Sequence, residues 1–217
     1  TRPTGDPSVW GLADAVGTVI EELGLRDIHL VGNDTGGAVS QVVLTRDPGT
    51  FATFALTNCD TEGNFPPAAF RPAVWAAKSG LLRGLGNPLV RMPTIAKQVD
   101  RSGYEHVSAV PDDVIVDYLA PILGTPEGVR FMTALLTSMT PEQLAPIRPL
   151  LQACEVPTAI VWGTGDIFFR RPWADWLVDL IPGATGVTEI PGGRLFVPDE
   201  RAPELVDALE SHWRHHG

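Results

Sequence analysis

Apolar residues recur along the chain at two different periods, and each period predicts a kind of element. Val9, Leu12, Val16 and Ile20 are three or four residues apart, which is the spacing of one helix face. Gly24 follows this pattern, and glycine is typical of a helix end. We therefore expect an amphipathic helix that begins at Val9 and is closed by Gly24.

Short apolar runs predict four strands. They lie at residues 27–33, 51–57, 156–162 and 186–190. Helical patterns lie between and after them, at residues 38–46, 172–181 and 202–213. Alternating strands and helices are typical of a parallel sheet with helices on both faces, so the predicted fold class is α/β.

Residues 63–151 interrupt this alternation. The segment holds many prolines and short helical patches, and it has no convincing strand pattern. We interpret it as a helical insertion. The expected domains are then a core of residues 1–62 and 152–217, and a helical domain of residues 63–151.

Composition narrows the class of protein. With 217 residues, 44 % of them apolar and 19 % charged, the chain is long and apolar enough to bury one large core. The formal charge of −10 disfavours binding to nucleic acid or to an anionic membrane surface. A small-molecule substrate remains the expected partner.

The two cysteines and the lengths of the apolar runs predict which features the protein lacks. The two cysteines, Cys59 and Cys154, give neither a disulfide scaffold nor metal-ligand spacing, and we interpret both as buried apolar residues. No apolar run reaches the length of a membrane span, and no leader pattern opens the chain. We therefore expect a cytoplasmic protein without metal or cofactor.

Candidate chemistry follows the predicted strands, because the ligands of parallel sheets bind at the carboxyl ends of strands. Gly32-Asn33-Asp34-Thr35-Gly36-Gly37 connects a strand to a helix. Small residues allow such a turn to be tight, and a tight turn presents its central side chain above the sheet. Asp34 is then a candidate nucleophile, although an aspartate here could also merely cap the following helix.

Three segments of this sequence resemble the α/β-hydrolase fold, and within it the haloalkane dehalogenase and epoxide hydrolase branch. Residues 30–38 are similar to the nucleophile turn of that branch, and residues 161–166 (Val-Trp-Gly-Thr-Gly-Asp) to its acid-bearing turn. Residues 192–200 are similar to its histidine loop, and residues 63–151 to its helical cap.

The resemblance implies a role for several residues. Asp34 would be the nucleophile, Asp166 the orienting acid, and the backbone N–H of Thr35 an oxyanion donor. Asp166 could otherwise be a turn residue. Asp60 follows the neighbouring strand, where some relatives place the acid, but a turn or cap role is the simpler interpretation.

The sequence departs from the family at the catalytic histidine. That position falls on Leu195, or on Arg194 if the loop is shifted by one residue, and neither side chain is a base at neutral pH. Without a base, an ester formed on the nucleophile would persist, or the chemistry would differ. His106, in the predicted cap, is the one histidine that could replace it, although a surface position is expected.

A second departure bears on the substrate. Thr35 replaces the tryptophan that binds the leaving halide in many dehalogenases, which favours an epoxide over a haloalkane. Opening an epoxide needs an acid, which cap tyrosines usually supply, and Tyr104 and Tyr118 both fall in the insertion. We expect Tyr118, Tyr104 and Trp75 to line the substrate pocket, although each could simply pack.

The resemblance also implies strands that would precede Thr1. Without them strand 27–33 would have a bare edge, so we expect an additional amino-terminal segment or a second copy of the chain to cover it. Three functions remain open: a hydrolase with an aspartate nucleophile, a ligand-binding scaffold that has lost hydrolysis, and a structural partner in an assembly.

Overall fold

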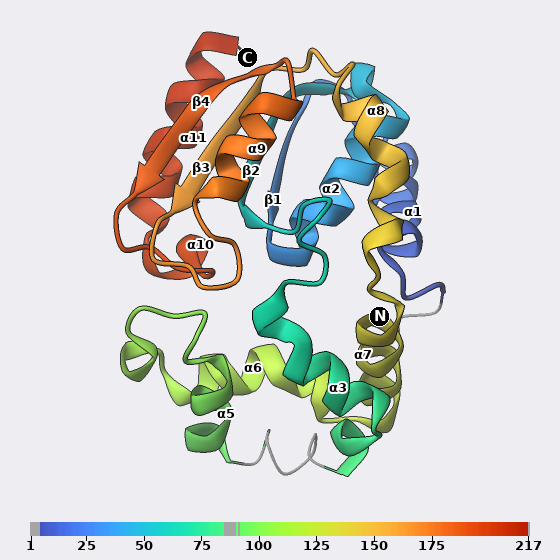
Figure 1. The fold of residues 1–217 in the computed structure, drawn as a ribbon, viewed down its shortest axis with the longest axis vertical. Coiled ribbons are helices and arrows are strands. Elements are labelled where there is room, and N and C mark those ends of the chain that lie inside the picture. Colours follow the sequence, from blue (N-terminus) through green and yellow to red (C-terminus); the bar gives the residue numbers. More distant parts are fainter. Residues whose placement is uncertain (1–4, 85–89, 91, 217) are drawn as a thin grey trace.

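A computed structural model describes residues 5–84, 90 and 92–216 of the protein (Figure 1). Its centre is a parallel sheet of four strands in the order β1-β2-β3-β4. The strands are β1 (Ile28–Asn33), β2 (Phe51–Cys59), β3 (Thr158–Gly163) and β4 (Ala184–Ile190). This confirms the predicted fold class. Parallel pairing places all four carboxyl ends at one edge of the sheet.

Helices cover both faces of the sheet (Figure 1). One face is covered by α1 (Val9–Glu22), α2 (Asp34–Arg46), α8 (Arg148–Leu151) and α9 (Pro172–Leu180). The other is covered by α11 (Ala202–His216), which follows the short α10 (Val197–Glu200). Connections that cross from strand to strand through a helix require this layered arrangement.

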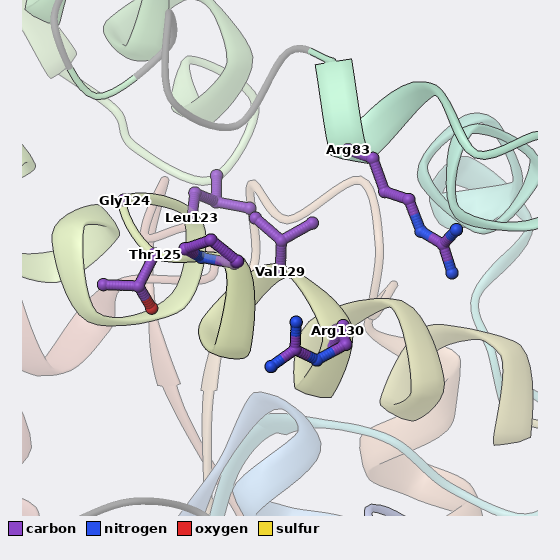
Figure 2. A pocket seen from close by; sticks show the side chains of 7 residues that line it. Arg83, Leu123, Gly124, Thr125, Val129 and Arg130 are labelled. Carbon is purple, nitrogen blue, oxygen red and sulfur yellow. The ribbon is translucent and has the colours of Figure 1, made fainter.

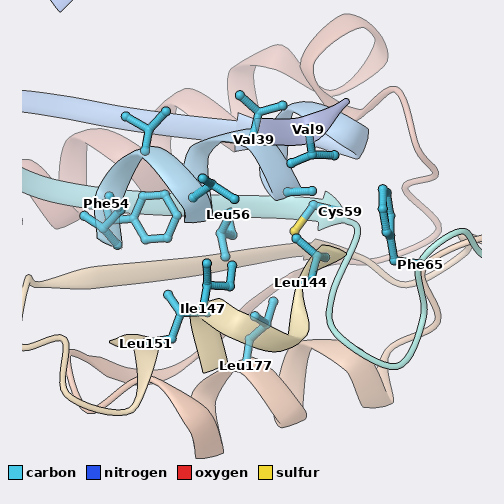
Figure 3. Packing of buried hydrophobic residues seen from close by; sticks show 14 of the residues in the cluster. Val9, Val39, Phe54, Leu56, Cys59, Phe65, Leu144, Ile147, Leu151 and Leu177 are labelled. Carbon is cyan, nitrogen blue, oxygen red and sulfur yellow. The ribbon is translucent and has the colours of Figure 1, made fainter. Parts of the chain in front are cut away.

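The main hydrophobic core lies between the sheet and the helices on the face that α2 covers. Phe54 and Leu56 of β2 are fully buried there, in one cluster with Leu177 of α9 (Figure 3). Leu44 of α2 belongs to the same cluster. A smaller cluster on the opposite face joins Val161 and Ile190 of the sheet to Leu205 and Leu209 of α11. Helices on two apolar faces explain why the strands read as nearly continuous apolar runs.

The segment between β2 and β3 is helical, and no strand occurs in its described residues. Its longer helices are α3 (Arg71–Lys78), α5 (Pro93–Asp100), α6 (Asp112–Leu123) and α7 (Pro126–Ser138). Most of this segment lies beyond the carboxyl-terminal edge of the sheet (Figure 1). However, Leu144, Ile147 and Leu151 pack in the main core (Figure 3). The domain boundary at residue 151 therefore stays a prediction.

The start of the second helix differs from the prediction in an informative way, whereas the first helix is close to it. The second helix begins at Asp34 rather than at residue 38, so the glycine-rich turn is itself the first turn of α2. The first helix spans Val9–Glu22 and is capped by the Ser8 side chain, close to expectation. The start of α2 matters for chemistry, because Asp34 then occupies a helix amino terminus.

Strand β1 forms one edge of the four-stranded sheet. Val31, in the middle of this strand, is 40 % exposed. What covers this edge stays a prediction. No helix within the described ranges is both long and apolar enough to cross a bilayer.

Candidate active site

Asp34 stands at the junction of β1 and α2, with a left-handed backbone of φ 52°. A residue other than glycine pays a cost of order 1 kcal/mol for this conformation. The turn is tight on its inner side. A Cβ added to Gly32 would approach the Ser40 Oγ to 2.1 Å, and one on Gly37 would approach the Cys59 Cβ to 2.2 Å. These two glycines are required for the turn that presents Asp34.

The environment of Asp34 disfavours its charge. Desolvation by burial is the largest cause, and the Asp166 carboxylate adds repulsion, so the Asp34 pKa is raised to about 6. A hydrogen bond from the Thr35 backbone N–H partly opposes the rise in pKa. Asp34 is therefore largely ionised at pH 7, but its surroundings stabilise its negative charge poorly, as expected of a reactive carboxylate.

Asp166 is a buried and firmly oriented carboxylate. Its Oδ1 accepts hydrogen bonds from the backbone N–H groups of Phe168 and Phe169, at 2.7 and 3.2 Å. Its Oδ2 accepts one from the Asn58 Nδ2 at 3.0 Å. Burial nevertheless raises the Asp166 pKa, while these bonds and the charge of Arg194 oppose the rise.

Asn58 joins the ends of two strands and was not predicted as a site residue. Its backbone is left-handed at φ 32°, and its side chain is fully buried. The amide donates to Asp166 and to the Gly163 carbonyl and accepts from the Gly163 N–H. Its position directly after the strand predicted for residues 51–57 was the available signal, although β2 itself extends to Cys59.

Asp60 contacts the turn and is not among the residues that line the cavity before Asp34. It is buried, and one of its oxygens has no hydrogen-bond partner in the described part of the protein. Burial and the nearby Asp34 raise its pKa well above the usual range. Its backbone N–H donates to the Asp34 carbonyl at 3.2 Å. These contacts support a role in holding the turn.

Leu195 occupies the place beside Asp34 where the resemblance puts a histidine. It is 7 % exposed and lines the same cavity as Asp34. The Asn33 side chain donates to the Leu195 carbonyl at 3.1 Å, so the backbone is fixed against the end of β1. The side chain of Arg194 instead donates to the carbonyl of Tyr104 at 2.9 Å.

The five histidines all belong to the described part of the chain, and none lines the cavity at Asp34. His29 stacks on Trp213 with 5.0 Å between ring centroids, and its Nδ1 is 2.8 Å from the Thr53 hydroxyl. His106 is exposed and lines a neighbouring hollow, which shares Tyr104 and Asp199 with the cavity at Asp34. His212 contacts the Pro157 carbonyl. No histidine therefore joins Asp34 to Asp166.

A largely apolar cavity of about 660 Å³ opens before Asp34. Its walls come from the sheet edge, the helical segment and the loop that carries Leu195. The lining residues are Asn33, Asp34, Phe70, Gly103, Tyr104, Tyr118, Leu119, Ile122, Phe168, Leu195, Phe196, Pro198 and Asp199. The volume is suited to a small organic molecule.

The two tyrosines of the insertion converge on one carboxylate. The Tyr104 hydroxyl donates to Asp199 Oδ2 at 2.8 Å, and the Tyr118 hydroxyl donates to Asp199 Oδ1 at 3.3 Å. Tyr104 is buried, whereas Tyr118 is 54 % exposed. Burial and the Asp199 charge raise the Tyr118 pKa. Asp199 had not been singled out from the sequence, because its partners are 95 and 81 residues away.

The structure brings together most of the residues singled out from the sequence. Asp34, Tyr104 and Tyr118 line one cavity, and Asp166 lies close enough to Asp34 to raise its pKa. Trp75 lies on α3, is 65 % exposed and is not among the residues that line this cavity. Its predicted contact with substrate has no support in this arrangement.

A second cavity, of about 400 Å³, lies within the helical segment near the start of α7 (Figure 2). Arg83 and Arg130 flank it beside apolar Leu123 and Val129. Arg130 is already paired with Glu127 at 2.9 Å. No carboxylate or histidine is among the lining residues, so Asp34's cavity is the better candidate site. Among the residues that are described, no cluster of side chains could hold a metal ion.

Comparison with solved structures places this fold among known ones. An α/β-hydrolase-fold protein from Burkholderia ambifaria superposes with a TM-score of 0.81 at 19 % identity, over 96 % of this chain and 74 % of that one. A haloalkane dehalogenase from Bradyrhizobium elkani superposes with a TM-score of 0.77 at 15 % identity, over 98 % and 77 % of the two chains.

A third similar structure is 2-hydroxy-6-oxo-6-phenylhexa-2,4-dienoate hydrolase from Rhodococcus. It has a TM-score of 0.75 at 19 % identity and covers 95 % of this chain and 70 % of its own. The sequence matches no protein-family model and no curated protein. At these identities the comparisons establish the α/β-hydrolase fold, which is the fold that the three sequence segments had indicated.

Proposed function

We propose that the protein is a hydrolase-type enzyme that acts on a small, largely apolar molecule, with Asp34 as the nucleophile. The observation that carries this proposal is the combination of a strained Asp34 backbone, at φ 52°, with an apolar cavity of about 660 Å³ in front of the side chain. A residue that only capped a helix would need neither feature.

The proposed first step is attack by an Asp34 oxygen on an sp³ carbon. With an epoxide, a ring C–O bond breaks and the ring oxygen takes up a proton, which leaves a hydroxyalkyl ester on Asp34. With a haloalkane, the carbon–halogen bond breaks and halide leaves. Thr35 offers no side-chain donor of the indole kind to the halide, which favours the epoxide.

The proton for the ring oxygen would come from a tyrosine of the cavity. Tyr118 is more exposed than Tyr104, and its hydrogen bond to Asp199 is longer, at 3.3 Å against 2.8 Å. The Tyr118 hydroxyl is therefore the easier of the two to turn from Asp199 toward a substrate. The raised pKa of Tyr118 makes it a weak acid, which predicts slow ring opening. Solvent would return the proton afterwards.

The second step needs water to attack the ester carbonyl, and here the site lacks a base. Leu195 fills the position beside Asp34, and Asp166 has no imidazole to orient. Removing a general base typically costs about 10²- to 10⁴-fold in rate. We therefore propose that the alkyl ester on Asp34 forms faster than it is hydrolysed.

The helical segment of residues 63–151 would serve as the cap of this site. It contributes Phe70, Tyr104 and Tyr118 to the cavity wall. Substrate choice would then depend on this segment, while the nucleophile is held by the sheet.

The test is incubation with a panel of epoxides and 1-haloalkanes, followed by intact-mass measurement and product analysis. We expect wild-type protein to gain the full mass of an epoxide, with little diol released, and the Asp34→Asn variant to gain nothing. Rapid diol release without an adduct would contradict the stalled second step. No adduct and no product with any of the panel would contradict the proposal.

A ligand-binding scaffold is the second candidate function. It is favoured by Leu195 in place of a base and by the tyrosine hydroxyls being occupied by Asp199. This function predicts saturable binding of apolar molecules with no change in protein mass.

A further inference from the structure

The cavity before Asp34 combines aromatic walls with two carboxylates that form no ion pair with a described residue. Two aromatic pairs line it: Phe70 with Phe168, whose ring centroids are 6.2 Å apart, and Tyr104 with Phe196, whose centroids are 4.3 Å apart. Two carboxylates, Asp34 and Asp199, line it as well. No lysine, arginine or histidine is among the residues that line this cavity.

Neither carboxylate has a cationic partner in the described parts of the chain. The nearby arginines are engaged elsewhere: Arg201 with Glu105 and Glu204, and Arg194 with the backbone carbonyls of Arg101 and Tyr104. Asp199 instead receives two phenol hydroxyls, one on each oxygen. Each of its oxygens retains a lone pair that can accept a further donor.

Asp199 is exposed to solvent at the rim of the cavity, where an incoming cation can reach it. Asp34 is partly buried, and a partly buried charge beside apolar walls is unfavourable unless a ligand brings the opposite charge. The raised pKa of Asp34 is one sign of that cost. Aromatic faces attract cations, by about 0.5–2 kcal/mol per contact. The acidic chain as a whole, with a formal charge of −10, would also attract cations.

We propose that this cavity takes small hydrophobic molecules that carry an ammonium group, with Asp199 as the specificity-determining anion and the aromatic rings as the surrounding wall. The inference rests on the proposed function in one respect, since it names the substrate class of the same site. Asp34 would attack the electrophilic carbon while Asp199 holds the charged end of the molecule.

The binding test uses one aromatic scaffold in three charge states: 2-phenylethylamine, 2-phenylethanol and phenylacetate, titrated by calorimetry at pH 8. We expect the cation to bind at least ~10-fold more tightly than the alcohol, and the anion most weakly. Asp199→Asn should remove most of this preference and leave the affinity for the alcohol unchanged.

The matched control is Asp207→Asn, which removes the same charge from an exposed position on α11. It should keep the preference for the cation. Equal affinity of wild-type protein for the amine and the alcohol would overturn the proposal, and so would a preference that survives in Asp199→Asn. The wild-type comparison remains decisive even if the Asp199 variant does not fold.

A second arm separates this inference from the proposed reaction. Wild-type protein is incubated with glycidyltrimethylammonium or with the neutral glycidyl isopropyl ether, and adduct formation is followed by intact mass. Faster labelling by the cationic epoxide supports both proposals. Equal labelling by the two epoxides contradicts the cation preference alone. Selective amine binding with no labelling by either contradicts the proposed reaction alone.

Discussion

At the scale of single residues, the chemistry depends on how Asp34 is charged. Three carboxyl groups lie near the carboxyl ends of the strands, and Asp34 is repelled by both of the others, Asp60 and Asp166. Burial raises the pKa of each, and no histidine or ion pair in the described part of the chain neutralises them. The positive end of α2 and the Thr35 N–H are the groups that favour the ionised form of Asp34.

The raised pKa of Asp34 predicts a pH dependence of stability. The folded state holds this proton up to about pH 6, while the unfolded chain loses it near 3.8, so stability falls as pH rises between these values. Asp34→Asn should stabilise the protein at pH 7.5 by at most about 3 kcal/mol and hardly at all at pH 4. Urea denaturation at both pH values measures this. A loss of stability at pH 7.5 would contradict the account.

Leu195 provides a second prediction at this scale. Leu195→His places a base in the cavity beside Asp34 and should shorten the lifetime of the alkyl ester by about 10²-fold or more. Arg194→His is the matched control for the other alignment of the loop. The adduct lifetime, followed by intact mass after excess epoxide is removed, distinguishes them. Unchanged lifetimes in both variants would show that a missing base is not what limits hydrolysis.

The role of a residue could be predicted from the sequence where neighbouring residues form a recognisable pattern with it. The small residues around Asp34 and the turn at Asp166 are contiguous in sequence, and each follows a strand. Asp199 and Asn58 were missed because their contacts join distant segments, across 95 residues in the Tyr104–Asp199 bond and 108 in the Asn58–Asp166 bond. Nothing in the sequence near Trp75 reveals which face of α3 is turned to solvent.

At the scale of elements, the strand-to-helix turn depends on close backbone packing. Gly37 of α2 sits against Cys59 of β2, so a Cβ at this position collides with a side chain that the core holds fixed. Gly36 is one residue away in the same helix and has open space around it. Alanine substitutions at Gly37 and Gly36 therefore separate the effect of close packing on stability from the effect of helix propensity.

Gly37→Ala should destabilise the protein by about 1–3 kcal/mol, because the added methyl overpacks the junction. Gly36→Ala should be neutral or stabilising by up to about 1 kcal/mol, because alanine is the better helix former. Thermal or chemical unfolding of the two variants checks this. Equal stabilities would show that the junction relaxes and that the turn is not constrained by Cys59.

At the scale of the whole molecule, one set of contacts ties the helical segment to the loop that carries Leu195 and to α10, in addition to the residues of the segment that pack in the main core. We call the contacts between residues 103–106 and 194–201 the strap. Glu200 accepts from the backbone N–H groups of Glu105 and His106 at 2.6 and 2.8 Å. Arg201 binds the Glu105 carboxylate, and the Phe196 N–H donates to the Gly103 carbonyl at 3.1 Å. The strap also positions Tyr104 and Asp199 in the cavity wall.

Glu200→Ala should loosen the strap, because two charge-assisted hydrogen bonds are lost. We expect a loss of stability of about 1–3 kcal/mol and faster amide exchange at residues 105 and 106. Glu204→Ala, which removes only an exposed pair with Arg201, should change stability by less than about 0.5 kcal/mol. Hydrogen exchange with mass detection measures both. Equal protection in the two variants would contradict the strap.

The α/β class was predictable at this scale because strand and helix patterns alternate outside the insertion. The packing of Leu144, Ile147 and Leu151 into the main core was not, because proline-rich short helices carry no period long enough to show a buried face. The position of the strap likewise depends on segments that are about 90 residues apart.

The most direct test of the account is the location of the covalent adduct. Protein treated with glycidyltrimethylammonium is digested, and the modified peptide is sequenced by tandem mass spectrometry, with Asp34→Asn treated in parallel. The account predicts a single modification on Asp34 that is absent from the variant. Modification at Cys59, Cys154 or other carboxylates, with Asp34 unmodified, would contradict it.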